Sequence, residues 1–394
     1  MKFILSWILL ISSFLNAQTA TQIIINAKHL IEQKKYDSAF NLLNHFDPKN
    51  GNIEAVLLKE EIVLNYFVSS MMHQLFALKD LSKNEKIEDF RGKEGTYSMH
   101  MFEVDQILDS LLKIYPNNCK LNKGLGDFYY EVHLKYGDRW LKTNKELFKL
   151  IEENYSQSIN NNCANFLDYY VMGYIKTTQE KYKEAIPYFT KSIQLNNNYT
   201  SAQYNLAYCF LYLDERDSAL IYAKQALEKY EDVSYKSDAA RMVAQIYTEL
   251  NDDKNAIVFY EKANFIDINN YDNLKPLLNI YLKTNHHNSS QITSLFFNLD
   301  AGNPTIYNDL EEIFWNHKKE NELILFYKEK LNENKNEPKV FGNLNFYLAK
   351  LHMEKDKKLS KHYFETAKDS FAKIFKPTHE IFKIIKDGLS ELNK

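Results

Sequence analysis

Small residues recur in the middle of the chain with a period of about 34 residues. Gly173 is followed by Ala207 and then by Ala244 at corresponding positions. In each of these three units a second small residue comes 12 positions later, at Ala185, Ala219 and Ala256. A fixed period of about 20 to 50 residues is typical of stacked repeats, in which each unit buries its apolar face against its neighbours. The sequence therefore predicts one repeat array.

Two helices in each unit account for these small residues. An apolar residue precedes the first small residue, as in Met172-Gly173, and the small side chain lets a partner helix approach closely. The second helix carries Ala185, Phe189 and Ser192 at spacings of four and three, which places them on one face. Such a pair cannot cover its own apolar face, so stacked pairs form the core. We therefore expect an all-α fold of antiparallel helix hairpins.

Composition supports helices and narrows the range of partners. The 394 residues include only 10 Gly and 7 Pro, too few turn-formers for a many-stranded sandwich or barrel. Hydrophobic residues make up 45%, which excludes a disordered chain. The 49 Lys and Arg against 52 Asp and Glu give a formal net charge of -3, without the basic surface that phosphate binding requires. We therefore expect no nucleic-acid partner.

The repeat resembles the tetratricopeptide repeat, a pattern of about 34 residues with a small residue in its first helix and Ala-x3-Phe in its second. The resemblance is best over residues 166–271. Its first unit carries the pattern at Tyr169, Met172, Gly173, Ala185 and Phe189. The proline that ends the pattern is replaced, in the three units, by Asn197, Glu231 and Ile268. The resemblance implies a right-handed superhelical solenoid of helix hairpins.

The match weakens away from the centre and divides the chain into the segments 1–17, 18–118, 119–270 and 271–394. The second and fourth segments are expected to hold degenerate helical repeats, and a helix after Pro377 is expected to cap the open end. The third segment is the central array, with one insertion around Gly137-Asp138-Arg139-Trp140.

One internal stretch, Ile62–Leu78, carries no formal charge. Its length is close to the lower limit for a helix that crosses a membrane, roughly 17 residues. It contains His73 and Gln74, which are costly in hydrocarbon. We expect instead one long helix from Ile53 to Leu81, buried in the array, and then a polar interruption at Ser82–Tyr97.

The N-terminus has the layout of a secretory signal peptide. Lys2 supplies a positive charge, Phe3–Leu15 is apolar apart from three serines, and Ala17 is a small residue at a cleavage point. The apolar stretch is too short to span a bilayer, which takes about 20 residues of helix. A buried first helix is the alternative. We expect residues 1–17 to be removed and the protein to be exported, either periplasmic or secreted, without an integral membrane segment.

Export gives the three cysteines an oxidising compartment. Cys119 and Cys163 both follow asparagine-rich loop segments, so a bridge between them is one alternative and two free thiols are the other. Cys209 lies in a helical stretch and is expected to be a small buried hydrophobe.

Recognisable catalytic, nucleotide-binding and metal-binding motifs are absent from the sequence. His286-His287 is the most metal-like pair, but it lies in a polar segment without a nearby third ligand. We therefore expect no cofactor, no metal and no enzymatic activity. An enzyme with a site assembled across distant repeats is the less favoured alternative.

In tetratricopeptide arrays the first helix of each hairpin lines a concave groove that can hold a peptide. The resemblance places the following residues in this groove: Tyr170, Tyr174, Tyr204, Asn205, Tyr208, Tyr212, Arg241 and Gln245. The alternative is that the tyrosines pack between repeats. The groove favours an exported, non-enzymatic scaffold for a peptide or protein partner. A regulatory or assembly subunit of a cell-envelope complex is the second hypothesis.

Overall fold

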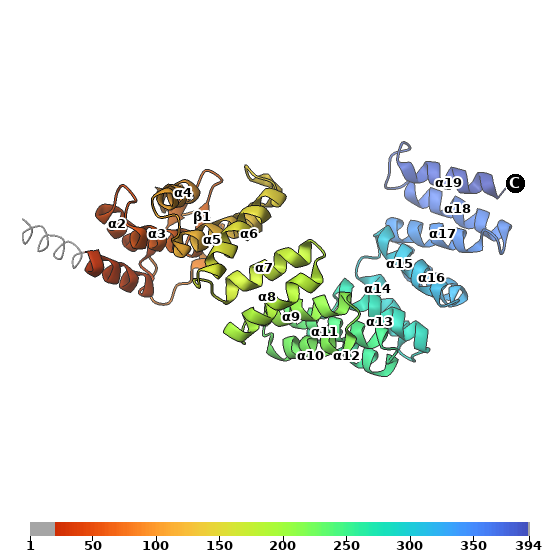
Figure 1. The fold of residues 1–394 in the computed structure, drawn as a ribbon. Helices are drawn as coiled ribbons and strands as arrows, with labels where there is room; N and C mark the ends of the chain where they lie inside the picture. Colours follow the sequence, from red (N-terminus) through yellow and green to blue (C-terminus); the bar gives the residue numbers. More distant parts are fainter. Residues whose placement is uncertain (1–19, 393–394) are drawn as a thin grey trace, which may run out of the picture. The chain divides into compact units, whose positions relative to one another are not determined.

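The computed structural model describes residues 20–392, and the predicted signal peptide at residues 1–17 lies outside them. The chain divides into two compact units, Met1–Cys209 and Phe210–Lys394. Within each unit, helices adjacent in sequence pack against each other as hairpins (Figure 1). The predicted all-α solenoid of helix hairpins is therefore confirmed.

The described part of the N-terminal unit pairs a first helix with a second helix four times. The pairs are residues 20–32 with α2 (Tyr36–Phe46), α3 (Ile53–Asn65) with α4 (Val104–Ile114), α5 (Cys119–Tyr136) with α6 (Asn144–Asn160), and α7 (Phe166–Thr178) with α8 (Tyr182–Leu195). Two short 3-10 turns are η1 (Ile87–Asp89) and η2 (Gly137–Arg139). The division between the two units falls inside α9 (Thr200–Tyr212).

The C-terminal unit repeats the same arrangement. Its helices are α10 (Arg216–Lys229), α11 (Val233–Glu249), α12 (Asp253–Ile266), α13 (Tyr271–Thr284), α14 (Ser289–Asn298), α15 (Pro304–Asn316), α16 (Glu320–Glu333), α17 (Pro338–His352), α18 (Lys357–Phe371) and α19 (Glu380–Glu391). The last helix follows Pro377 and packs against α18 through the buried side chain of Ile385.

The small residues mark the closest approach of paired helices. A Cβ atom built on Gly173 would lie 2.8 Å from the ring of Phe189, which is fully buried in the second helix of the same hairpin. Gly126 of α5 meets the ring of Tyr155 in α6 in the same way, and even more closely. Because carbon atoms in contact prefer about 3.5 to 4.0 Å, a larger residue would push the two helices apart. The structural role predicted for the small residue of the first helix is confirmed.

Asparagine provides turns that glycine would otherwise supply. Five asparagines adopt a left-handed backbone with φ between 53° and 60°: Asn50, Asn162, Asn251, Asn269 and Asn285. Asparagine tolerates this conformation better than most residues because its short side chain can hydrogen-bond locally. A chain with only 10 Gly can therefore still make many helix hairpins.

The predicted helix from Ile53 to Leu81 is wrong. α3 ends at Asn65, and the chain then forms a three-stranded antiparallel sheet of β1 (Ser69–Ser70), β2 (Leu75–Leu78) and β3 (Ser98–Met101), in that order. A buried glutamine anchors this sheet. Gln74, in the turn between β1 and β2, donates from Nε2 to Asp105 Oδ1 at 2.7 Å and accepts at Oε1 from the Val104 N–H at 2.5 Å. The sheet is thus an insertion between the two helices of the α3–α4 hairpin.

Two further expectations concern insertions and membrane spans. The insertion around Gly137 lengthens α5 and α6 to 18 and 17 residues, against 13 and 14 in α7 and α8, and adds η2 between α5 and α6.

Within residues 20–392, no helix has both the length and the apolar character needed to cross a bilayer.

Candidate functional site

A cleft of about 660 Å³ opens on the N-terminal unit between α3, α5 and α7, the first helices of three consecutive hairpins. The acidic and basic side chains that line it provide four carboxyl groups and two ammonium groups: Glu60, Glu61, Asp127, Glu131, Lys120 and Lys123. The formal balance is -2 (two minus four). Leu57, Leu64 and Leu167 add apolar walls. The cleft is therefore an acidic hollow with apolar sides.

Glu60 is the unusual residue of this cleft. Its side chain is only 4% exposed, and its Oε1 atom has no hydrogen-bond partner among the described residues. Gly124 on the facing helix makes room for the carboxyl group, because a Cβ atom there would lie 2.5 Å from Glu60 Oε2. Burial, and then the charge of Asp127, raise the pKa of Glu60 well above its usual range.

A hydrogen-bonded network joins the neighbouring carboxyl groups. Lys123 Nζ lies 2.5 Å from Asp127 Oδ2 and 3.4 Å from Asp168 Oδ1, and Tyr155 Oη donates to Asp127 Oδ1 at 2.8 Å. Ser158 Oγ donates to Asp168 Oδ2 at 3.2 Å. Burial lowers the pKa of Lys123, but Asp127 and Asp168 outweigh it and raise that pKa overall. The lysine of this network is thus already paired, and it leaves Glu60 Oε1 without a donor.

The two loop cysteines lie beside this cleft. Cys119 is the first residue of α5, and Cys163 lines the cleft in the segment before α7. Their Cα atoms are 5.8 Å apart and their sulfur atoms are at bonding distance. Cys209 is fully buried, with its sulfur 3.4 Å from Thr177 Oγ1.

Five residues of the predicted tyrosine groove lie in the N-terminal unit. Tyr170 is half-buried, packs its ring on Phe189 and Tyr199, and accepts a hydrogen bond from Asn205 Nδ2 at 3.3 Å. Tyr174, one turn further along α7, lies against the ring of Phe148, with ring centres 6.5 Å apart. The first of these tyrosines therefore has a polar partner within the groove, and the second packs on the neighbouring hairpin.

On α9, Tyr204 and Tyr208 are half-buried, and the ring of Tyr208 lies 6.2 Å from that of Tyr182. The predicted groove residues of this unit thus include tyrosines with ring contacts and one polar pair, Tyr170 with Asn205, and their role in partner binding stays a prediction.

The other three predicted groove residues lie in the C-terminal unit. Tyr212 is 56% exposed. Arg241 donates to Asp238 Oδ1 at 2.6 Å on the same helix, and the exposed Gln245 donates to Glu249 at 3.4 Å. Both polar side chains thus have local partners, and their role in partner binding stays a prediction.

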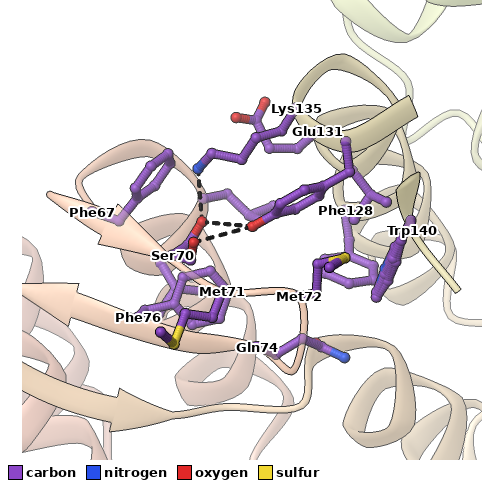
Figure 2. Close-up of a pocket in the computed structure, with 14 residues that line it drawn as sticks. Phe67, Ser70, Met71, Met72, Gln74, Phe76, Phe128, Glu131, Lys135 and Trp140 are labelled. Atoms are coloured by element: carbon purple, nitrogen blue, oxygen red, sulfur yellow. Dashed lines mark hydrogen bonds between the residues drawn. The ribbon is translucent and has the colours of Figure 1, made fainter. Parts of the chain in front are cut away.

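A second pocket lies between the small sheet and α5, but only about 20 Å³ of it is open, close to the space of one water molecule. Figure 2 shows how its polar groups hold the sheet in place. Lys135 Nζ donates to Ser70 Oγ at 2.7 Å and lies 3.2 Å from the centre of the Phe67 ring. Burial lowers the pKa of Lys135 to about 8. This pocket is a packing contact between sheet and helix.

Metal ligands of the usual types are not grouped in the described structure. Within residues 20–392, no set of three or more His, Cys, Asp or Glu side chains could hold an ion. The rings of His286 and His287 lie at a tilt with their centres 4.4 Å apart, and His286 stacks on Tyr281.

The fold and the cleft define a helical-hairpin repeat protein with an acidic hollow on its first helices. Two segments, residues 169–199 and 242–267, match the family model of the tetratricopeptide repeat. They correspond to the α7–α8 and α11–α12 hairpins. The chain therefore carries tetratricopeptide repeats in both of its units.

Solved structures of similar proteins share low sequence identity with the chain. YrrB, described as a TPR protein with an unusual peptide-binding site, is 20% identical over 44% of this chain and 83% of its own, with a TM-score of 0.38. A tetratricopeptide repeat protein from Parabacteroides merdae is 15% identical over 69% of this chain and 99% of its own, with a TM-score of 0.42. Pseudomonas aeruginosa PilF is 15% identical over 53% and 89%, with a TM-score of 0.40. No curated protein matches the sequence.

Proposed function

We propose that this chain is an exported, non-enzymatic scaffold whose acidic cleft binds a basic, extended segment of a protein partner. One observation carries the proposal: Glu60 is buried in the cleft with an unpaired carboxyl oxygen. A buried acceptor without a partner costs about 1 to 3 kcal/mol. A donor supplied by a partner would recover that free energy.

The charges around Glu60 favour a cationic donor over a neutral one. Asp127 and Glu131 lie on the same face of α5 at a spacing of four, and Lys123 is already paired with Asp127. A lysine or arginine of the partner would therefore meet an excess of negative charge. Its aliphatic stem would lie on the leucine walls, since long basic side chains bury their methylene groups and keep the charge near polar atoms.

Export and the absence of catalysis belong to the same proposal. The signal-peptide layout of residues 1–17 and the adjacent sulfur atoms of Cys119 and Cys163 both suit an oxidising compartment. In the described cleft, Lys123 and Asp127 neutralise each other, and neither a free cysteine thiol nor a histidine lines it. Such a cleft suits holding a partner better than transforming one.

Affinity capture from the native cell envelope, read by mass spectrometry, tests the proposal. Glu61→Gln combined with Glu131→Gln removes two cleft charges at positions that carry no hydrogen bond in the network described above. We expect this variant to capture much less of the partner than the wild type. Glu153→Gln on α6, an exposed charge in a second helix, is the matched control.

The salt dependence of capture and the cross-linked position of the partner give two further measurements. Capture by the wild type should weaken as ionic strength rises, since charge attraction is screened over about 10 Å at 0.1 M salt. Cross-linking should place a segment rich in lysine or arginine in the cleft. Equal capture by the cleft variant and the Glu153→Gln control, or a cross-linked segment without basic residues, would contradict the proposal.

A further inference from the structure

Exposed methionines are concentrated on the small sheet. The described residues include seven methionines, and the four most exposed are Met71, Met72, Met99 and Met101, at 51%, 47%, 51% and 66%. Met172 and Met242 are buried in the hairpins. The chain has only eight methionines in 394 residues, so half of them fall in two short segments, Met71-Met72-His73 and Met99-His100-Met101.

The strand register brings these two segments together. Met101 of β3 lies across from Leu75 of β2, and Met99 lies across from Ala77. Because alternate residues of a strand share one face, Met99 and Met101 lie on the same face of the sheet. On the other side of β2, the Met71 N–H donates to the Leu75 carbonyl at 3.0 Å, which places Met71 across from Leu75. Met71 and Met101 thus flank Leu75, with their strands about 10 Å apart (two strand spacings).

The neighbouring side chains have other roles. His100, between the two methionines of β3, turns to the opposite face and lies 2.6 Å from Asp37, with its ring on Phe40. Met72 lies beside Phe128 and Trp140 in the pocket between the sheet and α5 (Figure 2). Met71 also lines that pocket, but it stays 51% exposed, and Met99 and Met101 on β3 are 51% and 66% exposed, so all three methionines can be reached from solvent.

We propose that Met71, Met99 and Met101 bind one soft monovalent metal ion, Cu(I), on this face of the sheet. Thioether sulfur is a soft ligand that selects Cu(I) over Zn²⁺, Mg²⁺ or Ca²⁺. An unbranched, flexible methionine is also a poor choice for a solvent-facing strand if only apolar surface is needed, since β-branched residues suit strands better. Two methionines at alternate positions of β3 and a third across β2 can point their sulfur atoms at one ion above Leu75. The site is separate from the acidic cleft and does not depend on partner binding.

Silver(I), a redox-inert analogue of Cu(I), is the probe. The titration uses silver nitrate in chloride-free buffer without reductant, so that Cys119 and Cys163 are left as they are in the purified protein. The full chain carries Cys209→Ala, because a free thiol would bind silver in place of the thioethers. We expect one equivalent of Ag(I) by calorimetry and shifts of the Met71, Met99 and Met101 methyl resonances.

Leucine variants identify the ligands while keeping apolar volume. Met99→Leu with Met101→Leu should lower Ag(I) affinity by more than the roughly 10- to 100-fold that loss of a supporting group costs at metal sites. Met72→Leu, in the neighbouring pocket, should leave affinity unchanged, and circular dichroism checks that each variant folds. The proposal is overturned if the Cys209→Ala protein does not bind Ag(I). It is also overturned if the double variant binds Ag(I) as tightly as the Cys209→Ala protein, or if Met72→Leu loses as much affinity as the double variant. The methionines would then be an apolar surface.

Discussion

Gly126→Ala tests whether the small residues set the spacing of paired helices. The new Cβ atom would lie 2.5 Å from one ring carbon of Tyr155 and closer still to another, the tightest such contact among the described glycines. The ring cannot easily retreat, because Tyr155 is fully buried and its Oη donates to Asp127. Overpacking of this kind costs about 1 to 3 kcal/mol, and we expect the upper end. Alanine recovers about 1 kcal/mol of helix propensity, so the net loss is about 2 kcal/mol.

The same substitution in a Tyr155→Leu protein tests whether the ring of Tyr155 causes the loss. In Tyr155→Leu the ring is gone, so Gly126→Ala should become neutral or stabilise by up to about 1 kcal/mol. The interaction between the two substitutions is then about 2 to 3 kcal/mol, well above the scatter expected for independent sites. Hydrogen exchange of the α5 and α6 amides under increasing urea measures the local stability, since repeat arrays do not unfold as one unit. An equal loss in both backgrounds would refute the role assigned to Gly126.

Three further predictions concern the cleft and its surroundings. Burial gives Glu60 a higher pKa in the folded protein than in the unfolded chain. The free energy of unfolding should therefore fall as pH rises above about 4.3, the pKa of an unperturbed glutamate. Urea melts of Glu60→Gln at several pH values should show a weaker dependence on pH. Peptide mapping without reductant should find Cys119 joined to Cys163, and replacing both by serine should lower the unit's stability by about 2 to 4 kcal/mol. Replacing Tyr204 and Tyr208 by alanine should reduce partner capture in pull-downs, and unchanged capture would exclude these tyrosines as a contact surface.

The hairpins could be predicted from sequence because their period is local. Ala185, Phe189 and Ser192 share a face at helical spacing, and the facing small residue repeats at nearly the same distance in every central unit. The inserted sheet could not be predicted in this way. Ile62–Leu78 is an uncharged run that fits a buried helix or a buried strand equally well. The turn that separates β1 from β2 is at Gln74, a residue that carries no turn preference, and its φ of 60° depends on side-chain bonds to the start of α4.

The cleft was missed for a related reason. Its sequence features were present: Lys59-Glu60-Glu61 interrupts an apolar helix, and Lys123, Asp127 and Glu131 recur at a spacing of four. Each feature alone resembles a solvated helix face. Only the stacking of α3 on α5, across the inserted residues 66–103, buries Glu60 against Gly124.

Burial of Glu60 connects the stability of the empty protein to the selectivity of the cleft. In the empty cleft, desolvation keeps this carboxyl group protonated to unusually high pH, and its Oε1 atom has no partner in the described structure. A cationic side chain would reverse both effects, because a nearby positive charge favours the carboxylate and supplies the missing donor. A neutral donor would satisfy the oxygen without compensating the ionised form. The same desolvation that makes the empty cleft costly therefore favours basic segments over neutral ones, which is the discrimination that a scaffold for a basic partner requires.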